Sequence, residues 1–253
     1  MSDLANYFYS NKGRRIHKWT HFFDIYDRHL SQFRGQTVTM LEVGISRGGS
    51  LEMWKEYFKN KIKLYAVDVK PECKQFEEEN VRIFIGDQAD RHFLKTLQSE
   101  LPSLDIVIDD GGHTMEQQIR TFEELFGSIK EGGVYLCEDT HTSYKNEYGG
   151  GYKKSDTFIE YIKDLVDALH AYHSEDPALK PDAFATSIGS VHFYDGIVVV
   201  EKRKRKKPVD KKTGGKSRFK QKVRETVKGE GVVGVVKKGV RLLSRKMAKW
   251  MKV

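Results

Sequence analysis

Two groups of acidic residues in this sequence sit where they could bind a cation or move a proton. The stretch DIVIDDGGHTMEQQ ends a short apolar run in two aspartates, of which Asp110 is the second, and His113 follows three residues later. Another apolar run, GGVYLCED, ends in Glu138 and Asp139. Carboxylates bind divalent cations, and a neutral imidazole accepts protons. The plainer interpretation is that Asp110 caps the next helix and His113 is an ordinary surface residue, but the second acidic pair argues against it.

The elements that must position these residues alternate along the chain. β-rich runs lie at residues 37–44, 63–69, 81–87, 104–110 and 132–139. Segments with apolar residues at helical spacing lie at residues 50–60, 71–80, 91–101, 115–132 and 155–173. Such alternation predicts βαβ units and a parallel sheet. After the last helix, residues 184–202 give two β runs joined by Asp195-Gly196, a hairpin signal. We therefore expect an α/β fold with five parallel strands, an antiparallel C-terminal hairpin and helices on both faces.

Residues 1–36 precede the first predicted strand. The stretch RRIHKWTHFFDIYDRHLSQF predicts a helix over residues 14–33. Two roles are open for this segment. It could pack against the sheet, or it could form a lid in which Lys12, His17 and Tyr26 face a ligand cleft. The residues expected on the buried face of the helix are Trp19, Phe22, Phe23, Tyr26 and Leu30.

Every predicted parallel strand ends in an acid, and the carboxyl ends of such strands meet at one rim of the sheet, where these folds bind ligands. The seven acids are Glu42, Asp68, Asp87, Asp109, Asp110, Glu138 and Asp139. The loop EVGISRGGS after Glu42 has glycines that let a ligand approach the next helix. Ser46 stands where the middle glycine of a dinucleotide motif would be. Asp68 is placed to accept hydrogen bonds from a ribose. An acidic rim suits S-adenosylmethionine, a nucleoside that carries a sulfonium.

Several segments together resemble the macrolide-sugar O-methyltransferases of the macrocin and mycinamicin type, together with related rhamnosyl O-methyltransferases and cephalosporin-hydroxylase-like proteins. The resemblance covers about residues 10–175. Its segments are LEVGISRGGSLEMWKEYF, YAVDVKPECK, IFIGDQAD, LDIVIDDGGHTMEQQ and LFGSIKEGGVYLCEDTHTSY. It implies the Rossmann-like class I methyltransferase fold, with residues 37–201 as the methyltransferase domain.

The resemblance also implies roles for individual residues. Asp110, Glu138 and Asp139 would bind Mg²⁺, and His113 would act as the base. The expected cofactor-binding residues are Glu42, Gly44, Ser46, Gly48, Ser50, Asp68, Asp87, Gln88 and Asp109. Three oxygen-donor side chains with free positions for water or substrate fit Mg²⁺. A bound cation can orient vicinal sugar hydroxyls and lower the pKa of one of them. The expected activity is therefore Mg²⁺-dependent transfer of a methyl group from S-adenosylmethionine to a sugar hydroxyl. After Asp139, three tyrosines of a glycine-rich loop could stack on a sugar, with His141 nearby, or the loop could be an ordinary mobile one.

The chain's net charge of +8 divides unevenly. Residues 202–253 hold 21 of the 44 basic residues and three of the 36 acidic ones, so the preceding body is acidic. Residues 202–218 predict a solvated basic linker. Residues 219–253 predict a basic amphipathic helix that is interrupted by glycines. Such a helix binds anionic membrane surfaces. Nucleic acid is the rival partner, although an apolar stripe that includes Trp250 has no evident use on phosphate.

These observations predict a cytoplasmic enzyme attached peripherally to the inner membrane face, acting on a lipid-linked or surface glycan. Two well-separated cysteines and the lack of a secretory signal favour a reducing compartment. Two other functions are open. One is a metal-dependent hydroxylase or oxygenase, for which the two histidines of an iron site are not evident. The other is a methyltransferase fold that docks on membrane or RNA without turnover. The sequence also leaves open an oligomer.

Overall fold

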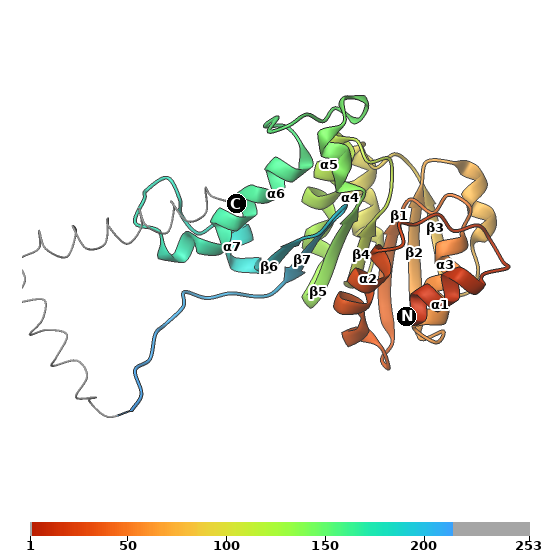
Figure 1. The fold of residues 1–253 in the computed structure, drawn as a ribbon, viewed down its shortest axis with the longest axis horizontal. Coiled ribbons are helices and arrows are strands. Elements are labelled where there is room, and N and C mark those ends of the chain that lie inside the picture. The colour runs from red at the N-terminus through yellow and green to blue at the C-terminus, as the bar shows by residue number, and fades with distance from the viewer. Residues whose placement is uncertain (1, 215–253) are drawn as a thin grey trace, which may run out of the picture. The chain divides into compact units, whose positions relative to one another are not determined.

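The computed structural model describes residues 2–214, which form a mixed seven-stranded sheet (Figure 1). The strand order is β3-β2-β1-β4-β5-β7-β6. β1 to β5 run parallel, and β7 runs antiparallel to both of its neighbours. The strands are β1 (Val38–Val43), β2 (Ile62–Asp68), β3 (Val81–Ile85), β4 (Leu104–Asp109), β5 (Ile129–Glu138), β6 (Ile188–Phe193) and β7 (Ile197–Lys202). The predicted Rossmann-like arrangement of five parallel strands and an antiparallel hairpin is confirmed.

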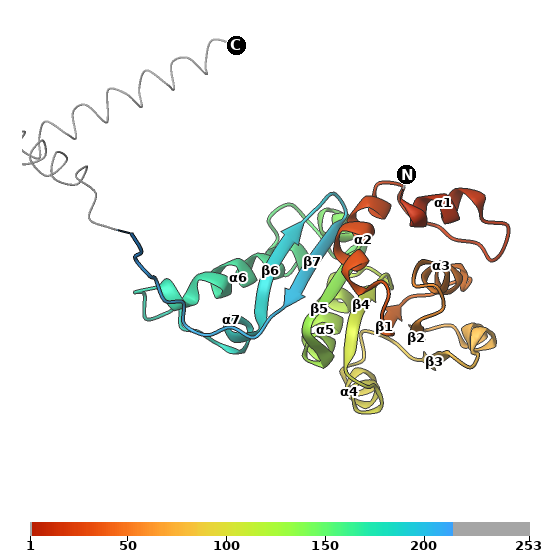
Figure 2. The ribbon, with the colours of Figure 1, turned by 90° about the horizontal axis from the view of Figure 1, so that it is seen from below.

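Helices cover both faces of the sheet (Figure 2). On one face lie α1 (Asp3–Ser10), α2 (Phe22–Leu30) and α3 (Gly49–Tyr57). On the other lie α4 (Arg91–Glu100), α5 (Met115–Leu125) and α6 (Phe158–His170). Successive side chains of β1 point to opposite faces of the sheet. Met40 belongs to the same core cluster as Trp54 of α3, and Leu41 belongs to the other core cluster with Phe122 of α5. A short helix, α7 (Ala183–Ser187), precedes β6.

The strand order locates the ligand crevice. β1 pairs with β2 on one side and with β4 on the other, so the chain reverses its direction of winding between β1 and β4. Ligands of open α/β sheets bind outside the carboxyl ends of the strands at such a switch point. At this rim, α5 begins with a capping box in which Thr114 and Gln117 bond each other's backbone amides. The cap fixes where the loop after β4 turns into α5.

The predicted helix over residues 14–33 is wrong in its first half. α2 begins only at Phe22, and residues 14–21 contain no helix. Trp19, expected on the buried face, has 53% of its surface exposed. Long-range contacts compete with the local helical pattern here, since the side chain of Lys18 bonds to the carboxylates of Asp110 and Glu138 at the sheet rim.

Three smaller predictions also differ from the structure. Residues 71–80 contain only the 3₁₀ helix Pro71–Phe76 instead of an α-helix. β5 begins at Ile129, inside the segment expected to continue the preceding helix. Residues 184–187 belong to α7 instead of the first strand of the hairpin.

The first residues of the predicted basic linker belong to the folded unit, which reaches Lys207. Lys202 ends β7, and the backbone amide of Arg203 donates to the Ser187 carbonyl at 2.8 Å. The predicted amphipathic helix at residues 219–253 lies outside the described residues. Within residues 2–214, no helix combines the length and apolar character needed to cross a bilayer.

Candidate active site

A cavity of about 600 Å³ opens at the carboxyl ends of the parallel strands. Its walls come from the loops after β1 to β5 and from the segment before α2. A volume of this size is typical of small-molecule sites. The predicted convergence of the strand-end acids is confirmed for five of the seven, because the cavity is lined by Asp68, Asp87, Asp110, Glu138 and Asp139.

One half of the cavity is built by the loop after β1. Gly44 has a φ of +86°, and a Cβ there would lie 2.1 Å from the backbone oxygen of Asp110, so only glycine lets the β1 and β4 loops meet. The backbone amides of Ile45 and Ser46 donate to Oδ2 of Asp68 at 3.1 and 2.9 Å. These bonds hold the Asp68 carboxylate at the cavity wall. Six of the nine residues expected to bind the cofactor line the cavity, namely Gly44, Ser46, Ser50, Asp68, Asp87 and Gln88.

Three predicted cofactor-binding residues, Glu42, Gly48 and Asp109, do not line the cavity. The Glu42 carboxylate is buried and accepts hydrogen bonds from Ser50 Oγ at 2.9 Å and Trp54 Nε1 at 3.1 Å. Gly48 is the residue before the first turn of α3. Glu42 and Gly48 therefore shape the loop after β1 without facing the cavity.

Asp109 also lies outside the cavity lining, where it supports the loop after β4 through a hydrogen bond with Gln88. Gln88 Nε2 donates to Oδ1 of Asp109 at 2.9 Å, and the amide of Gly112 donates to Oε1 of Gln88 at 2.8 Å. The Tyr135 hydroxyl donates to the other oxygen of Asp109 at 3.0 Å. A Cβ at Gly111 would lie 1.6 Å from Gln88 Oε1, which explains the glycine. The network therefore fixes the path of the loop that presents Asp110 and His113.

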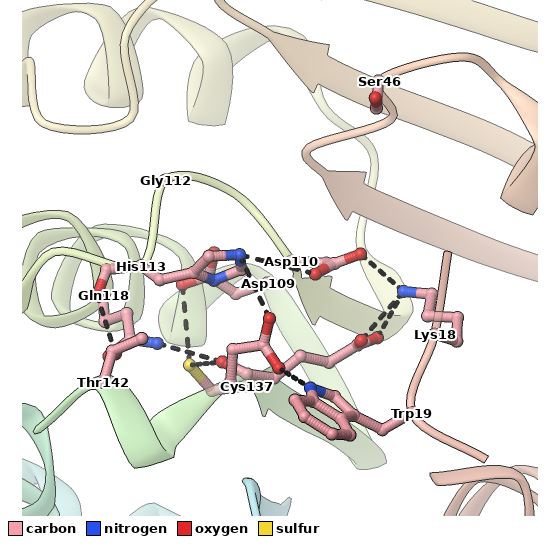
Figure 3. Close-up of polar contacts among 12 residues, drawn as sticks. Lys18, Trp19, Ser46, Asp109, Asp110, Gly112, His113, Gln118, Cys137 and Thr142 are labelled. Carbon is pink, nitrogen blue, oxygen red and sulfur yellow. Dashed lines mark hydrogen bonds and ion pairs between the residues drawn. The ribbon is translucent and has the colours of Figure 1, made fainter. Parts of the chain in front are cut away.

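The other half of the cavity brings Asp110, His113 and Asp139 together. Figure 3 shows His113 beside Asp110. His113 Nε2 lies 3.8 Å from Oδ1 of Asp110 and 3.4 Å from Oδ2 of Asp139. One ligand atom from each residue falls within 4.8 Å of the others. His113 and Asp139 both have left-handed backbones, with φ of 61° and 53°. Such conformations are uncommon outside glycine and concentrate at functional sites.

The chemistry of these donors fits Mg²⁺. Asp110 and Asp139 supply oxygen atoms, and their side chains are about one-fifth exposed, which leaves access for water or substrate. Glu138, the third predicted metal ligand, is adjacent but buried, and both of its carboxylate oxygens bond to a lysine. Among the described residues, Asp110 and Asp139 are therefore the carboxylates best placed for the metal.

That lysine is Lys18, a site residue that sequence reasoning missed. Its Nζ lies 2.6 Å from Oδ2 of Asp110, a contact that Figure 3 shows. The same Nζ lies 2.8 and 2.9 Å from the two oxygens of Glu138. The side chain is only 2% exposed. Burial opposes the charged form of Lys18, but the neighbouring carboxylates outweigh burial and raise its pKa above the ordinary value. Lys18 is therefore a fixed cation inside the acidic rim.

Burial also affects the two carboxylates that bond to Lys18. Burial raises the pKa of Asp110 to about 7 and the pKa of Glu138 to about 8, while the charge of Lys18 opposes both shifts. Removal of Lys18 would leave these acids without a counter-charge.

We expect Lys18→Met to lower the free energy of unfolding by about 3–5 kcal/mol, the range for breaking a buried ion pair by removing one partner. Chemical denaturation measures this loss. The matched control is Lys130→Met, which removes a partly exposed lysine paired with Asp105 and should cost much less. Equal stability of the two variants would show that Lys18 is not a buried counter-charge.

His113 is arranged to accept a proton. Burial lowers the pKa of His113 below its ordinary value and so favours the neutral imidazole. The negative charge of Asp139 opposes this shift but is the smaller effect. Nδ1 of His113 is buried without a hydrogen-bond partner, and Nε2 faces the cavity carboxylates. Thr142 Oγ1 donates to the His113 carbonyl at 2.9 Å and so holds this turn.

Trp19 is exposed at the edge of the half of the cavity that contains Asp110, His113 and Asp139. Its Nε1 donates to Oδ1 of Asp139 at 3.0 Å, and its ring meets His141 edge-on at 5.7 Å. Of the residues expected to form a lid, His17 lines the cavity, while Lys12 and Tyr26 do not. The loop tyrosines expected to stack on a sugar, at positions 144, 148 and 152, do not line the cavity either. The segment before α2 therefore supplies the aromatic surface.

Comparison with known proteins places this geometry in context. Residues 41–140 match a protein family described as a methyltransferase domain. The 8-demethyl-8-alpha-L-rhamnosyl tetracenomycin-C 2′-O-methyltransferase of Streptomyces olivaceus is 36% identical over 74% of this chain and 51% of its own length. The demethylmacrocin O-methyltransferase of Streptomyces fradiae is 33% identical over 80% of this chain and 53% of its own length.

A solved structure also matches. The MycE methyltransferase of the mycinamycin biosynthetic pathway, in complex with Mg and SAH, superposes with a TM-score of 0.70 at 32% identity. The match covers 80% of this chain and 54% of that one. The chain thus spans about half the length of each of these three relatives.

Proposed function

Because this chain belongs to the S-adenosylmethionine-dependent methyltransferases of the macrocin and mycinamicin sugar O-methyltransferase type, we propose that it methylates a sugar hydroxyl with the help of Mg²⁺. The observation that carries the proposal is the meeting of Asp110, His113 and Asp139 in one cavity. The two carboxylates would hold the metal beside the imidazole that accepts the proton. By their names, the Streptomyces olivaceus relative methylates a rhamnosyl tetracenomycin and the Streptomyces fradiae relative methylates demethylmacrocin, and the MycE structure is a complex with Mg and SAH.

In this proposal one half of the cavity binds S-adenosylmethionine and the other half binds Mg²⁺ and the sugar. When bound, S-adenosylmethionine supplies the methyl group, and Mg²⁺ supplies positive charge that orients a sugar hydroxyl and lowers its pKa. Asp68 would accept hydrogen bonds from the ribose, on the wall of the cavity formed by the loops after β1 and β2. His113 Nε2 would take the hydroxyl proton, since the neutral imidazole has a free lone pair. Most of the remaining contribution is positioning of the oxygen for in-line attack on the methyl carbon.

Incubation of the purified full chain with isotopically labelled S-adenosylmethionine and a panel of deoxyhexose glycosides tests this proposal. We expect transfer of the label to a sugar hydroxyl in Mg²⁺ and loss of transfer in EDTA. Transfer at equal rate in EDTA would contradict a role for the metal. Absence of transfer to every glycoside, with cofactor bound, would contradict the acceptor class.

A hydroxylase is the second candidate, and the site's donor set argues against it. Asp110 and Asp139 are both carboxylates, and His113 is the one imidazole of this group. Iron oxygenases of the facial-triad type use two histidines and one carboxylate. Two carboxylates favour a hard cation such as Mg²⁺, which suits methyl transfer to oxygen.

The exposed indole of Trp19 would form the platform for the acceptor sugar. Aromatic rings at the edge of a site offer an apolar face with a polar group at its rim. We expect Trp19→Ala to raise KM for the sugar acceptor several-fold and to leave S-adenosylmethionine affinity unchanged. Initial-rate kinetics against acceptor concentration measure the effect. Tyr152→Ala, which removes an aromatic residue outside the cavity lining, is the control. An unchanged acceptor KM in Trp19→Ala would rule out the platform.

We further propose that the acceptor is a lipid-linked or surface glycan and that residues 219–253 bind the anionic inner face of the membrane. The support comes from the sequence, where this basic tail follows an acidic body. Each basic residue close to such a surface contributes about 1 kcal/mol.

Deletion of residues 218–253 tests the membrane proposal. Sedimentation with anionic vesicles should capture the full chain and lose the truncated one, and neutral vesicles should capture neither. A truncated chain that still sediments with anionic vesicles would refute the proposal. Capture of the full chain by RNA instead of vesicles would favour the rival partner.

A further inference from the structure

A second group of potential metal ligands lies at the sheet edge formed by β6. His29 comes from α2, His192 from β6 and Glu201 from β7, and one ligand atom from each falls within 4.8 Å of the others. None of the three lines the cavity described above. The group therefore cannot be explained by the methyl-transfer site.

The spacing of the ligand atoms is unusual for hydrogen bonding alone. His29 Nδ1 lies 3.4 Å and His192 Nε2 lies 3.5 Å from the same oxygen, Oε1 of Glu201. Both distances exceed the 2.7–3.2 Å of an N–H···O hydrogen bond. Ligands about 2.0–2.1 Å from a tetrahedral zinc ion lie about 3.3 Å apart. The two distances from Glu201 Oε1 are thus close to the distance between two ligand atoms of a tetrahedral zinc site.

Neighbouring hydroxyls orient the group. The Tyr194 hydroxyl lies 2.8 Å from Nε2 of His29, and donation from Nε2 leaves a lone pair on Nδ1 facing Glu201. Ser190 Oγ lies 2.8 Å from Oε2 of Glu201 and 2.9 Å from His192 Nε2. Metal-bound histidines commonly have a hydrogen-bond partner on their second nitrogen, and Tyr194 takes this place at His29. Ser190 instead contacts the ligand nitrogen of His192, and zinc bound at Nε2 would replace that contact.

Burial and charge suit a ligand role. His29 is 4% exposed, so its ring is held in place by the surrounding core. The side chains of His192 and Glu201 are 36% and 35% exposed, which leaves an entry path and room for a water ligand. Two imidazoles and one carboxylate favour zinc over magnesium.

We propose that His29, His192 and Glu201 form a Zn²⁺ site that fastens α2 to the β6–β7 hairpin (Figure 2). The same hairpin accepts a hydrogen bond at the Asp195 carbonyl from His21 Nε2 at 2.9 Å. α2 follows directly on the segment that carries Lys18 and Trp19. Zinc at this edge would therefore stabilise the anchor of the segment that lines the active site.

Calorimetric titration of ZnCl₂ into the full chain tests the proposal, with excess Mg²⁺ present to occupy the active-site carboxylates. We expect one zinc ion per chain and a zinc-dependent rise in Tm. His192→Ala and Glu201→Gln should each weaken zinc binding at least about tenfold, and Tyr194→Phe should weaken it by about 10–100-fold through loss of ligand orientation. Co²⁺ in place of Zn²⁺ should give the absorption bands of a tetrahedral site.

Two control variants separate this site from others. His173→Ala removes an exposed histidine elsewhere, and Asp139→Asn alters the active site, so both should keep zinc binding. The proposal is overturned by an absence of zinc binding to the unmodified chain. It is equally overturned by unchanged affinity in His192→Ala and Glu201→Gln, or by loss of zinc binding in Asp139→Asn alone.

Discussion

Replacement of His113 by alanine is expected to lower kcat for methyl transfer by about 10²–10⁴-fold, the usual contribution of a general base. The imidazole is kept neutral by burial, and its Nε2 faces the carboxylates of Asp110 and Asp139. The side chain lies outside the wall that includes Asp68, so S-adenosylmethionine should bind His113→Ala as it binds the unmodified chain. Single-turnover rates and calorimetric titration of the cofactor measure the two properties separately.

The matched control for this variant is His141→Ala. His141 is also partly exposed and lies 3.8 Å from Asp139 Oδ1, but it does not line the cavity. Its loss should change the rate far less than loss of His113. Equal rates for the unmodified chain and His113→Ala would remove the base from the mechanism, and equal losses in the two histidine variants would point to a general disturbance of the loop after β5.

Asp139→Asn is the second substitution with a large expected effect. The change keeps the shape of the side chain and the oxygen that accepts from Trp19 Nε1, but it removes the negative charge beside Asp110 and His113. We expect Mg²⁺ affinity to fall at least about tenfold, as for other disturbances of metal ligation. Methyl transfer should fall with it and recover in part at high Mg²⁺ concentration. Titration of Mg²⁺ by calorimetry and by activity measures both effects.

Asp87→Asn is the control for Asp139→Asn. Asp87 lines the same cavity but accepts from the backbone amide of Ala89 at 2.8 Å, away from the proposed metal ligands. Its replacement should leave Mg²⁺ affinity unchanged. Identical Mg²⁺ affinity in Asp139→Asn and the unmodified chain would exclude Asp139 as a ligand.

The strand-end acids could be predicted from the sequence because parallel strands bring their carboxyl ends to one rim whatever the details of packing. The convergence of Asp68, Asp110 and Asp139 follows from that single rule. The rule does not say which way each side chain points. Asp109, next to Asp110, instead bonds Gln88 and Tyr135 behind the loop, because consecutive residues at a strand end face opposite sides.

Lys18 could not be found from local pattern. Its partners lie 92 and 120 residues away in the sequence. The segment that carries Lys18 forms neither a helix nor a strand in the structure. The apolar residues around Trp19 mimic the start of the helix that begins only at Phe22. One signal was present in the sequence, since buried carboxylates that converge need a nearby positive charge. A search of the segment before the first strand for a lysine or arginine would have included Lys18.

Titration of S-adenosylmethionine into the full chain, once in Mg²⁺ and once in EDTA, tests the central claim most directly. The division of the cavity into two halves predicts binding of similar affinity in both conditions, together with separate Mg²⁺ binding that Asp139→Asn weakens. Cofactor binding that disappears in EDTA would contradict separate cofactor and metal sites. An absence of binding in either condition would contradict the assignment of this cavity to S-adenosylmethionine.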